Sequence, residues 1–111
     1  MKTAEEFYSE IFEEIKELHK KKGADYGIKS DPFANLRGVA NLGISPWIGV
    51  FIRILDKIFR IQSFIKNQKL ENESIEDSFI DLANYAMLAL ALYREENQNV
   101  LDKETPPTLS R

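Results

Sequence analysis

PWIGVFIRILDKIFRIQSFI, residues 46–65, is an almost wholly apolar stretch interrupted by four charged side chains. On a helical wheel these charges and one glycine share a narrow face, at the spacing i, i+4, i+7, i+8 and i+11: Gly49, Arg53, Asp56, Lys57 and Arg60. The other faces carry Ile, Val, Leu and Phe. A surface helix normally has the opposite distribution of side chains, with one apolar stripe and polar residues on its other faces. The stretch therefore predicts a central helix, packed on most sides, with a polar groove along the remaining one.

The boundaries of this helix and of a partner follow from local signals. Ser45 followed by Pro46 is typical of an N-cap and a first-turn proline, and the pattern extends to about residue 67. Ser74 is an N-cap candidate for a last helix reaching about residue 96. That helix has the same pattern of one polar stripe among apolar faces, and its stripe comprises Asp77, Asp81, Asn84 and Tyr85. Because the connector is short, we expect two antiparallel neighbours whose acidic and basic stripes face each other.

The remaining segments complete an all-α fold. Thr3 and Glu6 form a capping-box pattern, which predicts an N-terminal helix over residues 4–22 that ends at Gly23. Residues 23–44 are predicted to be a long ordered loop with a short helix near 32–40. We expect one small helical bundle over residues 1–96 and a polar C-terminal tail over 97–111, which contains two prolines.

Composition narrows the class of protein. The chain has 111 residues, a net charge of −3 and a pI of about 5.2, which argues against general nucleic-acid binding because that needs a broad positive field. It has no cysteine and one histidine, so thiolate and multi-histidine zinc sites are excluded within one chain. Charges interrupt the longest apolar stretch, so we expect no membrane span, and a cytoplasmic protein. The apolar surplus of the two long helices predicts a homo-oligomer.

The two polar stripes have two interpretations. In the structural one, the three cations of residues 53–60 pair with Asp56, Asp77 and Asp81 in a network that fixes helix register. In the functional one, the cations bind the phosphates of a polyanionic ligand and the carboxylates hold Mg²⁺ between them, since magnesium takes few protein oxygens together with phosphate. Buried ion pairs often repay no more than their desolvation cost, so the functional interpretation is favoured.

Two further patterns are ambiguous. Asp25-Tyr26-Gly27 predicts either a turn or a loop that closes over the groove, with Tyr26 stacked on a base. In the second case Asn35 and Arg37 would offer hydrogen bonds to the ligand. Residues 13–17 fit the string EExxE, which is also typical of a solvated glutamate-rich face.

Several separated motifs resemble a known family. They are KxxDYG at residues 22–27, DPFANLR at 31–37, GI-x₄-GV-x₂-R-x₂-DK-x₂-R at 43–60, and ES-x₂-D-x₃-DLANYA at 73–86. Together they resemble small phage and prophage proteins called nucleotide modification associated domain 1, over about residues 15–95. That family is similar in its helical pattern to the all-α NTP pyrophosphohydrolases of MazG type.

The resemblance implies a nucleotide or cyclic nucleotide ligand and, for a phage-encoded protein, the host cytoplasm. MazG-type enzymes release pyrophosphate from an NTP with Mg²⁺ held by EExxE and ExxD motifs. The long insert after residue 17 and the lack of a clean ExxD depart from that pattern and put hydrolysis in doubt.

We therefore expect a nucleotide-binding protein, with three groups of site residues. The catalytic candidates are Asp77 and Asp81. The metal candidates are Asp56, Glu73, Asp77 and Asp81. The ligand-binding candidates are Arg53, Lys57, Arg60, Asn84, Tyr85, Asp25, Tyr26, Asn35 and Arg37. The alternatives are a noncatalytic binder that sequesters a nucleotide immune signal or a modified nucleotide, and a helical interaction module whose stripes are only structural.

Overall fold

The structure, a computed structural model, describes residues 1–26, 33–70 and 73–103. Within these ranges the side chains of residues 22–26, 34–35 and 99–103 lie outside the description. The elements are α1 (Ala4–Tyr26), the 3₁₀ helix η1 (Ala34–Leu42), α2 (Pro46–Asn67) and α3 (Ile75–Lys103). The described residues contain no strand, so the all-α prediction is confirmed.

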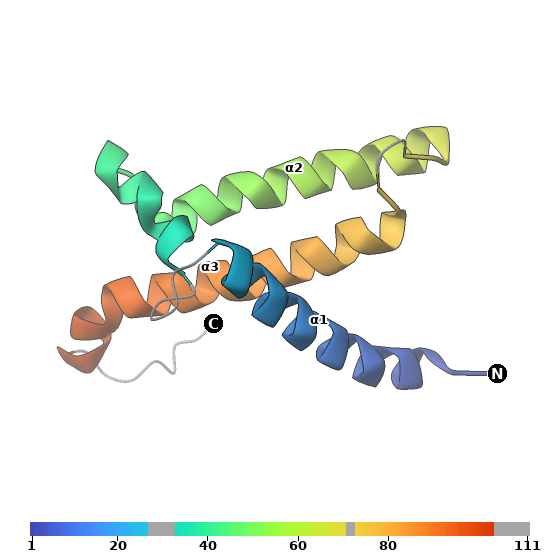
Figure 1. The fold of residues 1–111 in the computed structure, drawn as a ribbon, viewed down its shortest axis with the longest axis horizontal. Coiled ribbons are helices and arrows are strands. Elements are labelled where there is room, and N and C mark those ends of the chain that lie inside the picture. The colour runs from blue at the N-terminus through green and yellow to red at the C-terminus, as the bar shows by residue number, and fades with distance from the viewer. Residues whose placement is uncertain (27–32, 71–72, 104–111) are drawn as a thin grey trace.

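α2 and α3 lie side by side and antiparallel, as predicted (Figure 1). η1 crosses one end of this pair, and α1 packs against α3. The core lies where α2, α3 and η1 meet, and its buried residues are Leu36, Val50, Tyr85, Leu88 and Leu92. Gly49 permits the close approach of η1 to α2, because a Cβ there would stand 2.9 Å from the Cγ2 of Val39.

Two of the three predicted helix starts are confirmed by their hydrogen bonds. The Thr3 N–H donates to Glu6 Oε1 at 2.9 Å and the Glu6 N–H donates to Thr3 Oγ1 at 3.2 Å, a complete capping box. The Asp77 N–H donates to Ser74 Oγ at 3.0 Å. Ser45 is the N-cap residue of α2 and Pro46 lies in its first turn, as predicted, but the Ser45 side chain makes no capping hydrogen bond. Its hydroxyl donates instead to the Glu96 carboxylate at 2.9 Å, which links the start of α2 to α3.

Three boundaries differ from the prediction. α1 continues through Gly23 to Tyr26, since one glycine inside a helix costs only about 1 kcal/mol and does not end it by itself. α3 continues past residue 96 to Lys103, because the segment after Asn97 contains no helix breaker before Pro106. The short helix is a 3₁₀ helix that Gly43 terminates as its C-cap residue. The φ of Gly43 is 78°, a left-handed conformation that glycine adopts without a steric cost.

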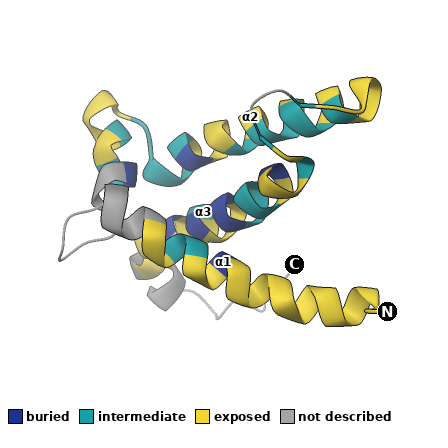
Figure 2. Ribbon diagram, turned by 45° about the vertical axis from the view of Figure 1, so that its right-hand side comes forward, coloured by how far each residue is buried: buried dark blue, intermediate teal, exposed yellow. Residues whose placement is uncertain are grey.

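The prediction that α2 is packed on most sides is wrong for the single chain. Its outward face exposes an apolar row at helical spacing, which comprises Ile48, Ile52, Leu55 and Phe59. α1 is also largely exposed, with Ile15 its one buried residue among those described (Figure 2). In the described residues no single helix is long and apolar enough to cross a membrane, although the bent pair Leu36–Leu42 and Pro46–Asn67 passes that test by length and composition.

Candidate functional site

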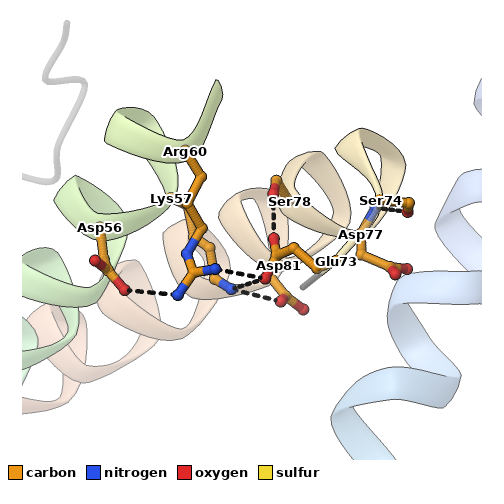
Figure 3. A network of polar contacts seen from close by, with 8 residues as sticks. All are labelled: Asp56, Lys57, Arg60, Glu73, Ser74, Asp77, Ser78 and Asp81. Carbon is orange, nitrogen blue, oxygen red and sulfur yellow. Dashed lines mark hydrogen bonds and ion pairs between the residues drawn. The ribbon is translucent and has the colours of Figure 1, made fainter. Parts of the chain in front are cut away.

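An ion-pair network joins the polar faces of α2 and α3, with Glu73 at its centre (Figure 3). One oxygen of Glu73, Oε1, lies 3.2 Å from Lys57 Nζ and 3.3 Å from Arg60 Nη1. The other oxygen accepts a hydrogen bond from the Ser78 hydroxyl. Lys57 Nζ also lies 3.0 Å from Asp81 Oδ2, so one ammonium bridges two carboxylates. The prediction that the two stripes face each other is therefore confirmed for Lys57 and Asp81.

The centre of this network is well shielded from water. The side chain of Lys57 is 12% exposed, and those of Glu73 and Asp81 are each 17% exposed. Burial by itself lowers the pKa of Lys57, but hydrogen bonds and charges from Asp81 and Glu73 outweigh it and raise that pKa. Burial likewise raises the pKa of Glu73, but the Ser78 hydroxyl, Lys57 and Arg60 outweigh it and lower that pKa. Lys57 and Glu73 are therefore held in their charged forms.

Arg60 is held less firmly than Lys57. Its Nη1 lies 3.3 Å from Glu73 and its Nη2 lies 3.7 Å from Asp56, whereas good arginine–carboxylate contacts measure about 2.7–2.9 Å. Its Nε is buried and has no acceptor among the residues that the structure describes. The Arg60 side chain is 39% exposed. Arg53, one turn before Lys57 on α2, is exposed and forms no ion pair with any described residue. The three cations thus differ: Lys57 is engaged, Arg60 is weakly held and Arg53 is open.

Asp77 lies apart from the network, so the predicted pairing of Asp77 with the α2 cations is wrong. Glu73, two residues before the start of α3 at Ile75, takes that place and pairs with Lys57 and Arg60. The exposed Asp77 side chain instead lines a hollow of about 430 Å³ between α1 and α3, together with the three glutamates of the EExxE string. Within the described residues no three His, Asp or Glu side chains are grouped to hold a metal ion. The four metal candidates therefore do not converge.

Asn84 and Tyr85 point to different environments. Tyr85 is 8% exposed and belongs to the core between α2 and α3. Asn84 is 2% exposed and lines a cavity of about 590 Å³ between α1 and α3. Its Nδ2 donates to no acceptor in the described part of the chain. The structure therefore separates these two ligand-binding candidates although they are adjacent in sequence.

Of the four ligand-binding candidates predicted within residues 23–44, the structure describes the side chain of Arg37. Arg37 Nη2 donates to both oxygens of Glu95 at 2.9 Å, and the guanidinium lies 5.7 Å from the centre of the Phe33 ring. Arg37 thus links η1 to α3. The side chains of Asp25, Tyr26 and Asn35, and the whole of Gly27, lie outside the described part of the chain.

The comparisons with known proteins become informative at this point. A family model described as nucleotide modification associated domain 1 matches residues 22–92, which is well over half of the chain. The chain belongs to this family. The match includes the whole network on α2 and α3 and also Asn84. Searches among curated proteins and among solved structures gave no match. The relation of this nucleotide modification associated domain to MazG-type enzymes stays a prediction.

Sequence reasoning missed two parts of this nucleotide modification associated domain. Ser78 is fully buried and its hydroxyl donates to Glu73. Its sequence signal was weak, because Ser78 follows Glu76 and Asp77 and resembles one more polar residue of the first turn. The cavity beside Asn84 was also missed. Phe12, Lys16 and His19 fall at i, i+4 and i+7 on one face of α1, and this spacing was the available sign of a shared wall.

Proposed function

We propose that this nucleotide modification associated domain binds a nucleotide whose phosphates lie against the polar face of α2, at Arg53 and Arg60. The observation that carries the proposal is the incomplete engagement of Arg60, whose ion pairs with described residues are long, at 3.3 and 3.7 Å. Family membership supports a nucleotide as the ligand.

A phosphate is a better partner for Arg60 than its present contacts. Arginine prefers two short parallel hydrogen bonds to one carboxylate or phosphate, and such bidentate pairs are about twice as strong as neutral hydrogen bonds. Arg60 now shares the single Glu73 oxygen with Lys57, so it can turn outward without leaving Glu73 unpaired. Arg53 lies seven residues earlier on α2, which is a rise of about 10.5 Å. The two guanidiniums can therefore contact separate phosphates of one nucleotide.

Lys57 has a supporting part in this proposal. Its ammonium is committed to Glu73 and Asp81, so it fixes the distance between α2 and α3 and offsets part of the negative charge of these carboxylates behind the phosphate site. This arrangement also favours binding over hydrolysis. The Asp81 carboxylate is engaged by Lys57, and Asp77 faces the hollow beside α1, so the two predicted catalytic carboxylates do not share one reaction centre.

We propose that Mg²⁺ binds to the site only together with the nucleotide. Mg²⁺ is usually bound by one or two carboxylates and by substrate phosphates, so a complete protein cage is not needed. Asp56 is the accessible carboxylate beside Arg60, with its side chain 65% exposed. We predict that Asp56 assists a phosphate-bound Mg²⁺. The fate of the ligand separates sequestration from hydrolysis: a binder returns the nucleotide unchanged after denaturation, whereas a pyrophosphohydrolase with Mg²⁺ releases pyrophosphate.

The proposal is tested by calorimetric titration of wild type and variants with nucleoside mono-, di- and triphosphates and with cyclic dinucleotides. We expect Arg53→Ala and Arg60→Ala each to weaken binding at least tenfold, which corresponds to about 1.4 kcal/mol. Lys66→Ala is the matched control, because Lys66 is an exposed cation in the last turn of α2 outside the network. Equal losses in all three variants would indicate a diffuse charge effect and would contradict the assigned site.

A further inference from the structure

The cavity between α1 and α3 has the size and lining of a ligand site. Its volume is about 590 Å³, within the roughly 300–1,000 Å³ of small-molecule pockets. Apolar side chains from both helices form most of the wall, and Phe33 closes the end nearest η1. The charged Lys16 and Glu13, both exposed, stand among the lining residues. An apolar hollow with charges at its exposed side suits a ligand with a flat apolar body and a polar end.

One buried polar group breaks the apolar lining. Asn84 is 2% exposed, and its Nδ2 finds no acceptor among the described residues. A buried donor without an acceptor destabilises a fold, and an apolar residue such as leucine would have filled the position without that cost. An asparagine at such a place is suited to a polar partner that a bound ligand can supply.

Aromatic rings flank the same cavity. Phe12 and His19 come from α1, and the His19 ring lies 5.6 Å from the Phe33 ring, centre to centre, with the planes tilted by 47°. Rings in offset or tilted arrangements attract one another and attract a further ring. Met87, 56% exposed, forms part of the opposite wall and can change rotamer to admit a guest, since methionine has a flexible unbranched side chain.

We infer that this cavity receives the base of a nucleotide, as a planar heteroaromatic ring whose ring nitrogen or carbonyl oxygen accepts a hydrogen bond from Asn84 Nδ2. The inference rests on the proposed function and assigns a second part of the same site. Asn84 follows Asp81 by three residues, a rise of about 4.5 Å along α3, and Asp81 holds Lys57 at 3.0 Å. The base site thus lies one helical turn from the network on α2. Since Nδ2 is shielded in this structure, binding requires the neighbouring side chains, Met87 above all, to move aside.

The inference is tested by NMR with two probes that separate base from phosphate. The four common deoxynucleosides, which lack phosphate, probe the cavity, and inorganic pyrophosphate probes the cations of α2. The side-chain amide signals of Asn84 are assigned by their loss in Asn84→Leu. We expect at least one deoxynucleoside to shift these signals, and pyrophosphate to shift the side-chain signals of Arg53 and Arg60.

Two variants and one control extend the test. Asn84→Leu removes the donor, and Ala91→Trp fills the cavity from the exposed side of α3 without changing Asn84. Each should reduce deoxynucleoside affinity at least tenfold and leave pyrophosphate binding unchanged. Asn67→Leu is the control, because Asn67 is exposed and its amide donates to Ser63 at 3.3 Å, at the far end of α2.

The outcomes separate the two proposals. Deoxynucleoside shifts at Asn84 without any pyrophosphate shift would support the base site and remove the phosphate site. Pyrophosphate binding with no movement of the Asn84 signals at millimolar deoxynucleoside would overturn the base site and leave the proposed function standing. Deoxynucleoside binding that survives both Asn84→Leu and Ala91→Trp would also overturn it.

Discussion

Replacing Lys57 by methionine tests whether the network between α2 and α3 holds the fold together. The substitution keeps the length and most of the volume of the side chain but removes the ammonium. Asp81 then loses the partner at 3.0 Å, and Glu73 keeps only Arg60 and the Ser78 hydroxyl. Both carboxylates are mostly shielded, so their charges are left partly uncompensated.

The magnitude follows from this shielding. Removing one member of a fully buried ion pair costs about 3–5 kcal/mol, and an exposed pair contributes about 0–1 kcal/mol. The side chains here are 12–17% exposed and Glu73 retains two partners, so we predict a loss of about 2 kcal/mol. For a domain of this size that corresponds to a fall in melting temperature of roughly 8 °C.

Urea unfolding followed by circular dichroism measures this loss. Asp56→Asn is the control, because the Asp56–Arg60 pair is long, exposed and within one helix, and such pairs contribute about 0.3–0.5 kcal/mol. We expect the loss in Lys57→Met to be several times that in Asp56→Asn, with similar m-values. Equal small losses in the two variants would refute the assignment of Lys57 as the bridge between the helices.

Three further predictions follow from the described residues. The pKa of Glu73 is lower in the folded state than its unfolded value of about 4.3, so its negative charge stabilises the fold above that value, and this contribution is lost as pH falls through the folded pKa. The difference in unfolding free energy between wild type and Glu73→Gln should therefore become smaller in acid. A constant difference between pH 7 and pH 3 would contradict this. Asn84→Leu should raise the melting temperature of the ligand-free protein, because it removes a buried donor without an acceptor, and a fall would show that the amide has a structural partner. The predicted homo-oligomer should use the exposed apolar row of α2, so Ile52→Glu and Phe59→Glu should lower the mass measured by light scattering, and unchanged mass in both would exclude this face.

The central helix pair was predictable because its signals are local. The stripe of cations on residues 53–60, the proline at residue 46 and the cap at Ser74 each act within a few residues of their position. Periodicity shows which side chains share a face, and a short connector makes the two helices antiparallel. These rules led to the correct fold class and to the opposed polar faces of α2 and α3.

The partners within the site were less predictable, because they depend on contacts between helices. Glu73 precedes α3 and pairs with both Lys57 and Arg60, which a wheel drawn for the helix alone does not show. Asn84 and Tyr85 share the polar stripe in sequence, yet the placement of α1 puts a cavity beside the first and the core beside the second. Ser45 is the predicted N-cap residue, but the partner of its hydroxyl is Glu96, 51 residues away, which local sequence does not indicate.

Nucleotide binding by the wild-type protein is the central claim, and a thermal-shift screen tests it most directly. Nucleoside mono-, di- and triphosphates and cyclic dinucleotides would each be added in excess, with and without Mg²⁺. A ligand at one hundred times its dissociation constant stabilises the folded state by about 2.7 kcal/mol, a rise of several degrees in melting temperature. We predict such a rise for at least one nucleotide, and its loss in Arg60→Ala. An unchanged melting temperature with every nucleotide at millimolar concentration would contradict the claim.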